Sequence, residues 1–193
     1  MIKGKQMTEL NQRYGLNPPH SEINSASQLI APCTTLDMGC SNGRNALYLS
    51  RLGFQVTAVD TNPNAIQALQ QIIAQEGIDN IDARVYDINQ ASLDAEYGFI
   101  ACTVTLMFLD PGRVQAVLDD MQQHTAAGGY NLIVCAMDTA AHPCPIRFPF
   151  TFKEGELKAA YQGWELIKYN EDMGTMHNGA QLQFATLLAR KPG

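Results

Sequence analysis

Short apolar runs alternate with longer amphipathic segments along most of the chain. Short apolar runs bounded by turn-forming or acidic residues are typical of buried strands, and apolar residues at helical spacing are typical of helices that cover them. The pattern predicts seven strands, at Thr34–Met38, Gln55–Asp60, Asp82–Tyr86, Gly98–Val104, Leu132–Met137, Trp164–Asn170 and Gln181–Arg190. Strands that alternate with helices in this way indicate an α/β fold with a largely parallel sheet.

Amphipathic segments predict five helices, at Ser21–Ile30, at Arg44–Arg51, from Pro63 to near Gly77, from Val114 to the pair Gly128-Gly129, and at Lys153–Gln162. Asn62 is the expected N-cap of the third helix, because its side chain can accept from the free N–H groups of the first turn. Residues 140–150 contain three prolines, which predicts an irregular loop. The last two strands are expected to form an antiparallel pair at the edge of the sheet.

The length of 193 residues favours a single domain spanning 1–193, with 1–31 as an N-terminal helical lid segment and 34–193 as a Rossmann-like core. The net charge is −6 and no Lys/Arg cluster occurs, which argues against nucleic acid as a partner. The longest apolar run, Phe99–Leu109, is too short to span a bilayer, so we expect no membrane association. A polar stretch at 1–11 lacks the features of a secretion signal and favours a cytoplasmic protein.

The five cysteines include no CxxC pair, so no metal site is expected. The surface pattern predicts no particular oligomeric state.

Acidic residues and glycines gather at the carboxyl ends of the first three predicted strands, where parallel sheets bind their ligands. The first strand runs into Asp37-Met38-Gly39-Cys40-Ser41-Asn42-Gly43, directly before a helix whose N-terminus offers free N–H groups to a carboxylate. Asp60 ends the second strand, where a carboxylate can accept both hydroxyls of a ribose. Asp87 follows the third strand, where a carboxylate can accept from an adenine amine. Each feature alone also fits a plain turn, cap or loop; the three together favour a nucleotide-like cofactor.

Together, Asp37-x-Gly39-x-Ser41-x-Gly43, Asp60 and Asp87 resemble the motifs of class I S-adenosylmethionine-dependent methyltransferases. The resemblance implies a Rossmann-like domain with a mostly parallel seven-stranded sheet, a C-terminal antiparallel strand pair and helices on both faces. It implies S-adenosyl-L-methionine as cofactor, with Asp37 and Gly39 near the methionine portion, Asp60 on the ribose and Asp87 at the adenine. The other cofactor-site residues on this reading are Cys40, Gly43, Arg44, Ile88 and Thr103, with Arg44 a candidate for the methionine carboxylate.

Two other enzyme classes fit the sequence poorly. The fingerprint of nicotinamide dinucleotide enzymes is Gly-x-Gly-x-x-Gly, which differs from the spacing here, and a dehydrogenase usually needs a second domain. Amino-methylating DNA enzymes carry Asn or Asp followed by Pro-Pro and an aromatic residue after the fourth strand. The segment Thr103–Asp110 has no such motif.

Segments scattered over most of the chain are similar to the tellurite-resistance methyltransferases of the TehB type. They are Cys40–Asn45, Leu106–Leu109, Gly128–Val134, Ala136–Thr139, Phe148–Phe150, Phe152–Leu157, Gly163–Glu165, Lys168–Asp172 and Phe184–Thr186. The resemblance implies an enzyme that methylates a small-molecule acceptor, a tellurium or selenium oxyanion or a derivative, and so confers tellurite resistance. Arg147 in the proline-rich loop and His177, which matches a family position between the last two strands, are candidates for steering an anionic acceptor.

Two alternative functions stay open, namely methylation of another soft acceptor such as a thiol or natural product, and a non-catalytic cofactor-binding sensor or adaptor. A soft chalcogen with a lone pair needs no proton removed before it attacks the methyl group, so we expect no essential general base. Positioning the partners in line can supply roughly 7–11 kcal/mol in favourable cases. Phe148, Phe150 and Phe152 either cover the site or pack in the core.

Overall fold

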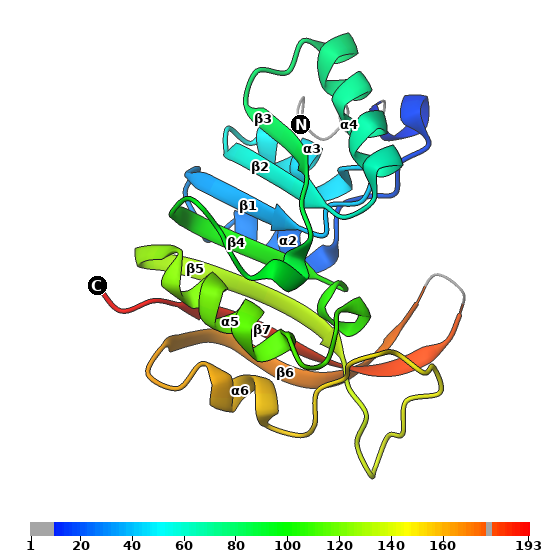
Figure 1. Ribbon diagram of the computed structural model, residues 1–193, viewed down its shortest axis with the longest axis vertical. Helices are drawn as coiled ribbons and strands as arrows, with labels where there is room; N and C mark the ends of the chain where they lie inside the picture. Colours follow the sequence, from blue (N-terminus) through cyan, green and yellow to red (C-terminus); the bar gives the residue numbers. More distant parts are fainter. Residues whose placement is uncertain (1–9, 177–178) are drawn as a thin grey trace. The chain divides into compact units, whose positions relative to one another are not determined.

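The computed structural model describes residues 10–176 and 179–193, which form two compact units (Figure 1). Unit 1 ends at Asp87 and unit 2 begins at Ile88. The single domain expected from the length, and the lid role of residues 1–31, stay predictions. In the part of the chain that the structure describes, no helix has both the length and the apolar character needed to cross a membrane.

Unit 1 alternates strands and helices as the hydrophobic pattern predicts. Its elements are a helical stretch at residues 10–14, α2 (Ser21–Ser27), β1 (Thr34–Met38), α3 (Arg44–Arg51), β2 (Gln55–Asp60), α4 (Pro63–Glu76) and β3 (Ile81–Val85). The three strands are parallel in the order β3-β2-β1. β1 and β2 coincide with their predicted ranges, because each is short, mostly apolar and bounded by a turn.

The predicted cap of α4 is confirmed. The side-chain oxygen of Asn62 accepts from the backbone N–H groups of Asn64 and Ala65, at 3.0 and 3.4 Å. Pro63 follows in the first turn, where its missing N–H group leaves no donor unsatisfied. The start of α4 is therefore fixed by local chemistry alone.

Unit 2 combines a parallel strand pair with an antiparallel one. Its elements are η1 (Ile88–Gln90), β4 (Tyr97–Thr103), η2 (Leu106–Phe108), α5 (Val114–Gln123), β5 (Thr125–Ala136), α6 (Glu156–Ala160), β6 (Glu165–Thr175) and β7 (Gln181–Arg190). β4 and β5 are parallel, whereas β7 is antiparallel to both β5 and β6. The order within the unit is β4-β5-β7-β6, so the predicted C-terminal antiparallel pair is confirmed.

The Gly128-Gly129 pair does not end a helix, contrary to the prediction. α5 already ends at Gln123, and both glycines lie inside β5, which begins at Thr125. The pairing of β5 with β4 jumps from Thr125 to Tyr130, so the glycines form an irregularity in the strand. A Cβ atom on Gly129 would lie 2.9 Å from the carbonyl oxygen of Gly98 on β4. Glycine is needed there for close approach of two strands, a contact that a local pattern does not encode.

The remaining differences concern element ends. α2 stops at Ser27 rather than Ile30, and β3 and β4 each begin one residue earlier than predicted. α6 is confined to Glu156–Ala160, because Phe152 pairs with Met137 and Lys153 therefore still belongs to the preceding extended segment. β6 continues to Thr175, five residues past its predicted end, because β7 pairs with it over that whole length.

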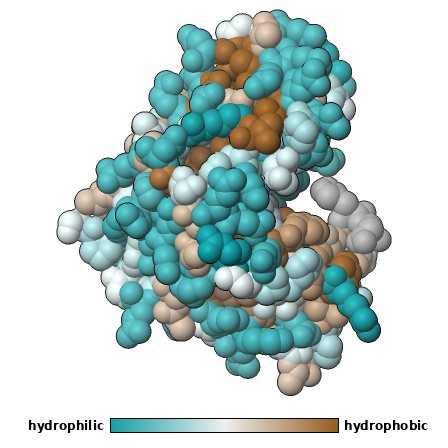
Figure 2. Space-filling model, viewed as in Figure 1, coloured by the Kyte–Doolittle hydropathy of each residue, from teal (hydrophilic) through white to brown (hydrophobic). Residues whose placement is uncertain are grey.

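Apolar side chains from helices and strands fill the interior of each unit. Fully buried examples are Leu36, Leu47, Leu49 and Leu69 in unit 1, and Phe99, Ile100, Ile133, Leu157 and Leu187 in unit 2. On the face shown in Figure 2, hydrophilic side chains cover most of the surface and apolar ones come to it in a few areas. Among the described residues, the exposed large apolar side chains are Leu29, Val85, Phe108, Ile167 and Met173.

Candidate cofactor site and acceptor loop

The turn after β1 is held against β2 by backbone hydrogen bonds. The N–H groups of Gly39 and Cys40 both donate to the carbonyl oxygen of Val59, at 2.8 and 2.9 Å. Gly43 closes the turn by donating to the carbonyl of Cys40 and adopts a φ of 86° as the residue before α3. The positive φ favours glycine, and a Cβ atom on Gly43 would also lie 2.9 Å from a methyl carbon of Leu69, which would have to shift.

Asp37 is an acidic residue buried in the interior of unit 1, with 1% of its surface exposed. Its carboxylate accepts hydrogen bonds from the Asn45 side chain and from the backbone N–H of Ala46, in the first turn of α3. The Oδ2 atom is buried and has no hydrogen-bond partner among the described residues. Burial raises the pKa of Asp37 to about 7, although these two hydrogen bonds and the charge of Arg44 act in the opposite direction.

Asp60 is fixed by the turns on either side of it. Its Oδ2 atom accepts from the backbone N–H of Ser41 at 2.8 Å, and its Oδ1 atom accepts from that of Asn62 at 2.9 Å. Each carboxylate oxygen has a second lone pair, so the group can still accept hydroxyl donors from a ligand. The bond to Ser41 also holds that residue at a φ of 49°, in the left-handed region.

Asp87 is exposed and lies close to Asp60 along the strand ends. The N–H of the preceding residue, Tyr86, donates to the carbonyl oxygen of Asp60 at 3.0 Å. The structure therefore brings Asp37, the Gly39–Gly43 turn, Asp60 and the segment before Asp87 together within unit 1, as the sequence predicts.

Cys40 and Arg44 flank this group of residues. Cys40 is 3% exposed, and burial together with the charges of Asp37 and Asp60 raises the pKa of its thiol far above the usual range. A thiol that stays protonated is a poor nucleophile, so Cys40 is a structural part of the turn. Arg44 is partly exposed at the start of α3 and acts electrostatically on Asp37.

The other two predicted cofactor residues belong to unit 2. Ile88 is buried in η1, and Thr103 is a buried residue at the carboxyl end of β4. Val104 follows Thr103 with a φ of 58°, which is strained for a β-branched residue, and its N–H donates to the carbonyl of Val134 at 2.7 Å. The chain turns sharply there into η2, which ends in Phe108, 59% exposed.

Arg147 lies in the proline-rich loop of unit 2. It is exposed and makes no hydrogen bond or ion pair with any other residue that the structure describes. The next residue, Phe148, contacts Phe108 edge to face, with ring centroids 5.4 Å apart. Phe152, just after the loop, is fully buried, whereas Phe148 and Phe150 within it are partly exposed. The second acceptor candidate, His177, lies outside the described residues.

Two residues whose side chains form hydrogen bonds in these regions have no role in the sequence prediction. Asn45 is 5% exposed and links Asp37 to the N-terminal segment, because its Oδ1 atom accepts from the backbone N–H of His20 at 3.0 Å. Asp138, just beyond β5, binds two other parts of the proline-rich loop. A buried asparagine in the first turn of a helix is a weak sequence signal for Asn45, and no local signal distinguishes Asp138 from an ordinary loop residue.

Metal binding has no obvious location in these units. Among the described residues, no group of three or more His, Cys, Asp and Glu side chains is arranged to hold an ion.

The sequence matches the family model "Tellurite resistance protein TehB" over residues 2–188. A "Probable S-adenosyl-L-methionine-dependent methyltransferase TehB" of Haemophilus influenzae is 45% identical over 193 residues, covering 97% of this chain and 67% of that protein. "Hemagglutinin 1" of Eikenella corrodens is 49% identical over 189 residues, covering 95% of this chain and 63% of that protein. The chain thus spans about two thirds of the length of these relatives.

The fold also matches a solved structure. The crystal structure of TehB from Haemophilus influenzae aligns with a TM-score of 0.90 at 45% identity, covering 94% of this chain and 65% of that one. This match and the observed parallel and antiparallel strand pairs confirm the predicted class I methyltransferase fold.

Proposed function

Because the chain belongs to the TehB family, we propose that it transfers the methyl group of S-adenosylmethionine to a small, soft acceptor of the tellurite or selenite type and contributes to tellurite resistance. The proposal has two parts, the cofactor and the acceptor, and each is supported by residues of a different unit.

The buried, unpaired Oδ2 atom of Asp37 is the observation that carries the cofactor part. A buried acceptor without a donor costs free energy, so the site is chemically incomplete until a donor arrives. The amino group of the methionine portion is such a donor, and as a cation it also stabilises the ionised form of a carboxylate whose pKa burial has raised. Gly39 and Gly43 allow the backbone to approach that portion closely.

Asp60 and Asp87 complete the proposed cofactor site. The remaining lone pairs of the Asp60 carboxylate suit the two ribose hydroxyls, and its orientation is fixed beforehand by Ser41 and Asn62. Asp87 is exposed next to this position and can accept from the adenine amine. Arg44 is the proposed partner of the methionine carboxylate, and Cys40 is a proposed neutral part of the lining in unit 1. The cofactor roles of Ile88 and Thr103 stay predictions from the sequence.

The acceptor part is supported by the chemistry of the proline-rich loop. Arg147 offers a cation without a competing partner among the described residues, which suits an oxyanion. When bound, the cofactor supplies a methyl group activated by a sulfonium. The acceptor lone pair forms the new bond to carbon while the carbon–sulfur bond breaks, and its electron pair stays on sulfur. No proton is removed, so the residues of this chain need only bind, orient and exclude water.

The direct test is acceptor-dependent formation of S-adenosylhomocysteine. Purified protein is incubated with S-adenosylmethionine and tellurite or selenite, and both the demethylated cofactor and the methylated chalcogen are quantified. We expect both products in equal amounts and none without acceptor. Turnover with a thiol but not with either oxyanion would assign the enzyme to another soft acceptor. Tight cofactor binding without turnover on any acceptor would favour a sensor or adaptor.

A further inference from the structure

The loop between β5 and α6 is closed at its base by main-chain pairing. Met137 and Phe152 form an isolated parallel bridge, and the N–H of Phe152 donates to the carbonyl of Ala136 at 3.1 Å. The N–H of Asp138 donates back to the carbonyl of Phe152 at 3.0 Å. Residues 139–151 therefore leave β5 and return to it as one closed excursion, which we name the acceptor loop.

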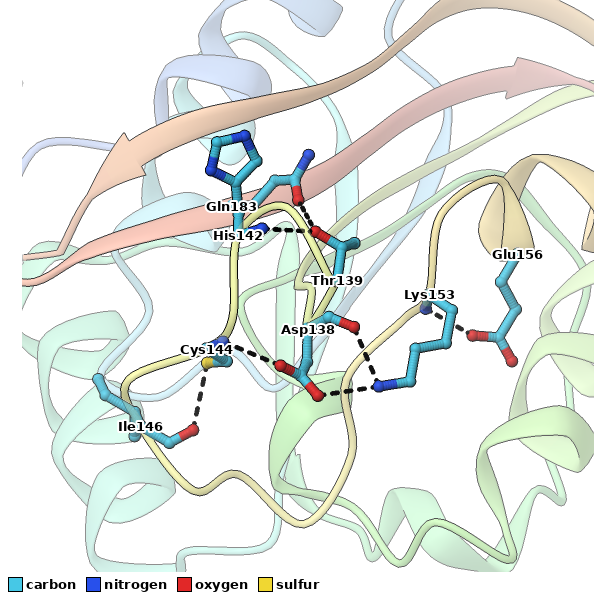
Figure 3. A network of polar contacts seen from close by, with 8 residues as sticks. All are labelled: Asp138, Thr139, His142, Cys144, Ile146, Lys153, Glu156 and Gln183. Atoms are coloured by element: carbon cyan, nitrogen blue, oxygen red, sulfur yellow. Dashed lines mark hydrogen bonds and ion pairs between the residues drawn. The ribbon is translucent and has the colours of Figure 1, made fainter.

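Asp138 binds Cys144 within the loop and Lys153 just after it, through its side chain and its carbonyl (Figure 3). Its Oδ1 atom accepts from the backbone N–H of Cys144 at 2.9 Å. The ammonium of Lys153 donates to its Oδ2 atom at 2.9 Å and to its carbonyl oxygen at 3.0 Å. The middle of the acceptor loop is thus tied to both of its ends by a single residue.

A second tie links the loop to the last two strands. The Thr139 hydroxyl accepts from the N–H of His142 at 3.1 Å and donates to the Gln183 side chain on β7 at 2.8 Å. The amide nitrogen of Gln183 in turn donates to the carbonyl of Glu171 on β6 at 2.9 Å. The first turn of the loop is therefore fixed by a strand 44 positions away.

The ion pair between Asp138 and Lys153 contributes little to the stability of the whole protein. The side chains of Lys153 and Asp138 are 63% and 43% exposed, and solvent-exposed ion pairs contribute little to the free energy of unfolding. What the ties restrict is the path of residues 140–151, which Pro143, Pro145 and Pro149 already stiffen. A restricted path on an exposed loop is of use when the loop presents residues to a ligand.

The far side of the acceptor loop lies at the carboxyl end of β4. The N–H of Phe150 donates to the carbonyl of Met107 at 3.2 Å, and the ring of Phe148 contacts that of Phe108, both in η2. Arg147, the unpaired cation, is next to Phe148. In parallel α/β sheets, ligands bind beyond the carboxyl ends of the strands, and the loop covers that end of both β4 and β5.

We propose that Asp138 is the positioning residue of the acceptor loop: through Cys144 and Lys153 it sets the path that places Arg147 for binding of the methyl acceptor. This inference rests on the proposed function, because it takes an anionic acceptor at Arg147 as given. Asp138 itself touches neither acceptor nor cofactor, and its effect is exerted through the loop.

Asp138→Ala is the central variant, with S-adenosylhomocysteine formation measured over a range of tellurite concentrations. We expect the KM for tellurite to rise about threefold, because a displaced Arg147 binds the acceptor less well, while kcat and the cofactor Kd change less than twofold. Asp138→Asn keeps an oxygen for the Cys144 amide and loses the charge, and is expected to fall between wild type and Asp138→Ala. Glu154→Ala is the matched control: it removes an exposed acid beside Lys153 that has no partner among the described residues, and should behave as wild type.

A double-mutant cycle shows whether Asp138 acts through Arg147. If it does, Arg147→Gln raises the tellurite KM less in the Asp138→Ala background than in wild type. Independent, additive effects of the two substitutions would overturn the inference. An unchanged tellurite KM in Asp138→Ala would overturn it as well.

Loop order has its own readout that needs no turnover. Hydrogen exchange at the Cys144 amide and the rate of Cys144 alkylation, both resolved by mass spectrometry, are expected to increase in Asp138→Ala and not in Glu154→Ala. Faster exchange with an unchanged KM would make Asp138 structural only. Should wild type act on a thiol and not on tellurite, the proposed function fails, and Cys144 exchange and alkylation in Asp138→Ala then decide separately whether Asp138 sets the path of the loop. Turnover of neither acceptor would contradict both.

Discussion

Asp37 in unit 1 and Asp138 in unit 2 are both aspartates at the carboxyl end of a strand, in opposite surroundings. Asp37 is buried, one oxygen has no partner among the described residues, and its pKa is raised to about 7. Asp138 is partly exposed, and the Cys144 amide and then Lys153 lower its pKa. One carboxylate oxygen of Asp37 is thus buried without a donor, whereas both carboxylate oxygens of Asp138 accept hydrogen bonds from the chain.

This contrast extends to the way each unit shapes its site. In unit 1 the proposed cofactor residues belong to short turns whose backbone bonds to the next strand, as Gly39 and Cys40 do with Val59. In unit 2 the acceptor loop is long, and side chains far apart in sequence, such as Thr139 and Gln183, hold it. In the proposed function, the cofactor therefore meets short local turns, and the acceptor meets a long loop whose path depends on a few side chains.

Replacement of Asp37 by Asn is expected to have the largest effect. It removes the charge that receives the cofactor amino group, so cofactor affinity should fall about a hundredfold. Calorimetric titration with S-adenosylmethionine measures this. Because a buried carboxylate is removed, the free energy of unfolding of the ligand-free protein at pH 8 should rise, which urea denaturation tests. Asp82→Asn, the same change at an exposed position of unit 1, should alter neither quantity; unchanged cofactor affinity in Asp37→Asn would break the contrast.

The raised pKa of Asp37 predicts how cofactor affinity depends on pH. The ammonium of the ligand binds the ionised carboxylate, so affinity should fall about tenfold per unit as pH drops below 7 and level off just above it. Proton release upon binding at pH 6, measured by calorimetry in buffers of different ionisation enthalpy, is the direct check. The pKa of Asp37 is lowered by the hydrogen bonds from Asn45 and Ala46 and by the charge of Arg44. The charge of Asp60 raises it, in the same direction as burial. If the cofactor affinity of Asp37→Asn depended on pH as steeply as that of wild type, another titrating group would be responsible.

The raised pKa of Asp37 also predicts how the stability of the folded protein depends on pH. The pKa of Asp37 is higher in the folded state than its ordinary value, so its contribution to stability is present at low pH and is lost as pH rises from about 4 through about 7. Asp138 behaves in the opposite way: its lowered pKa means that loop order is present above the ordinary range of aspartate and lost as pH falls. Cys144 amide exchange against pH measures the second trend.

Replacement of Arg147 by Gln tests the proposed binding of an anionic acceptor in unit 2. We expect the tellurite KM to rise about fivefold, the size of one exposed charge-assisted contact, with cofactor affinity unchanged. Arg147→Lys should recover part of the loss, and the KM for a neutral thiol acceptor should not respond to either change. An equal effect on tellurite and thiol would show that Arg147 does not select an anion.

Replacement of Ser41 by Gly is expected to have the smallest effect. Ser41 has a φ of 49°, so glycine relieves left-handed strain but adds freedom to the unfolded chain, and the net gain in unfolding free energy is about 0.5 kcal/mol. Urea denaturation measures it, and Ser41→Ala, which keeps the strain, should not be stabilised. Cofactor affinity should be unchanged in the glycine variant, because the Ser41 N–H that meets Asp60 is retained. A stabilised alanine variant would point to the hydroxyl instead of the backbone.

β1, β2, the cap of α4 and the turn from Asp37 to Gly43 could be predicted because each depends on residues a few positions apart, and motifs along the chain predicted the family. The place of Gly129 in a strand, the extension of β6 to Thr175 and the contact of Asn45 with Asp37 became apparent only in the folded chain. So did the hydrogen bonds of Asp138 with Cys144 and Lys153. These features arise from strand pairing and from hydrogen bonds between segments distant in sequence, and a periodic pattern of apolar residues carries no record of such partners.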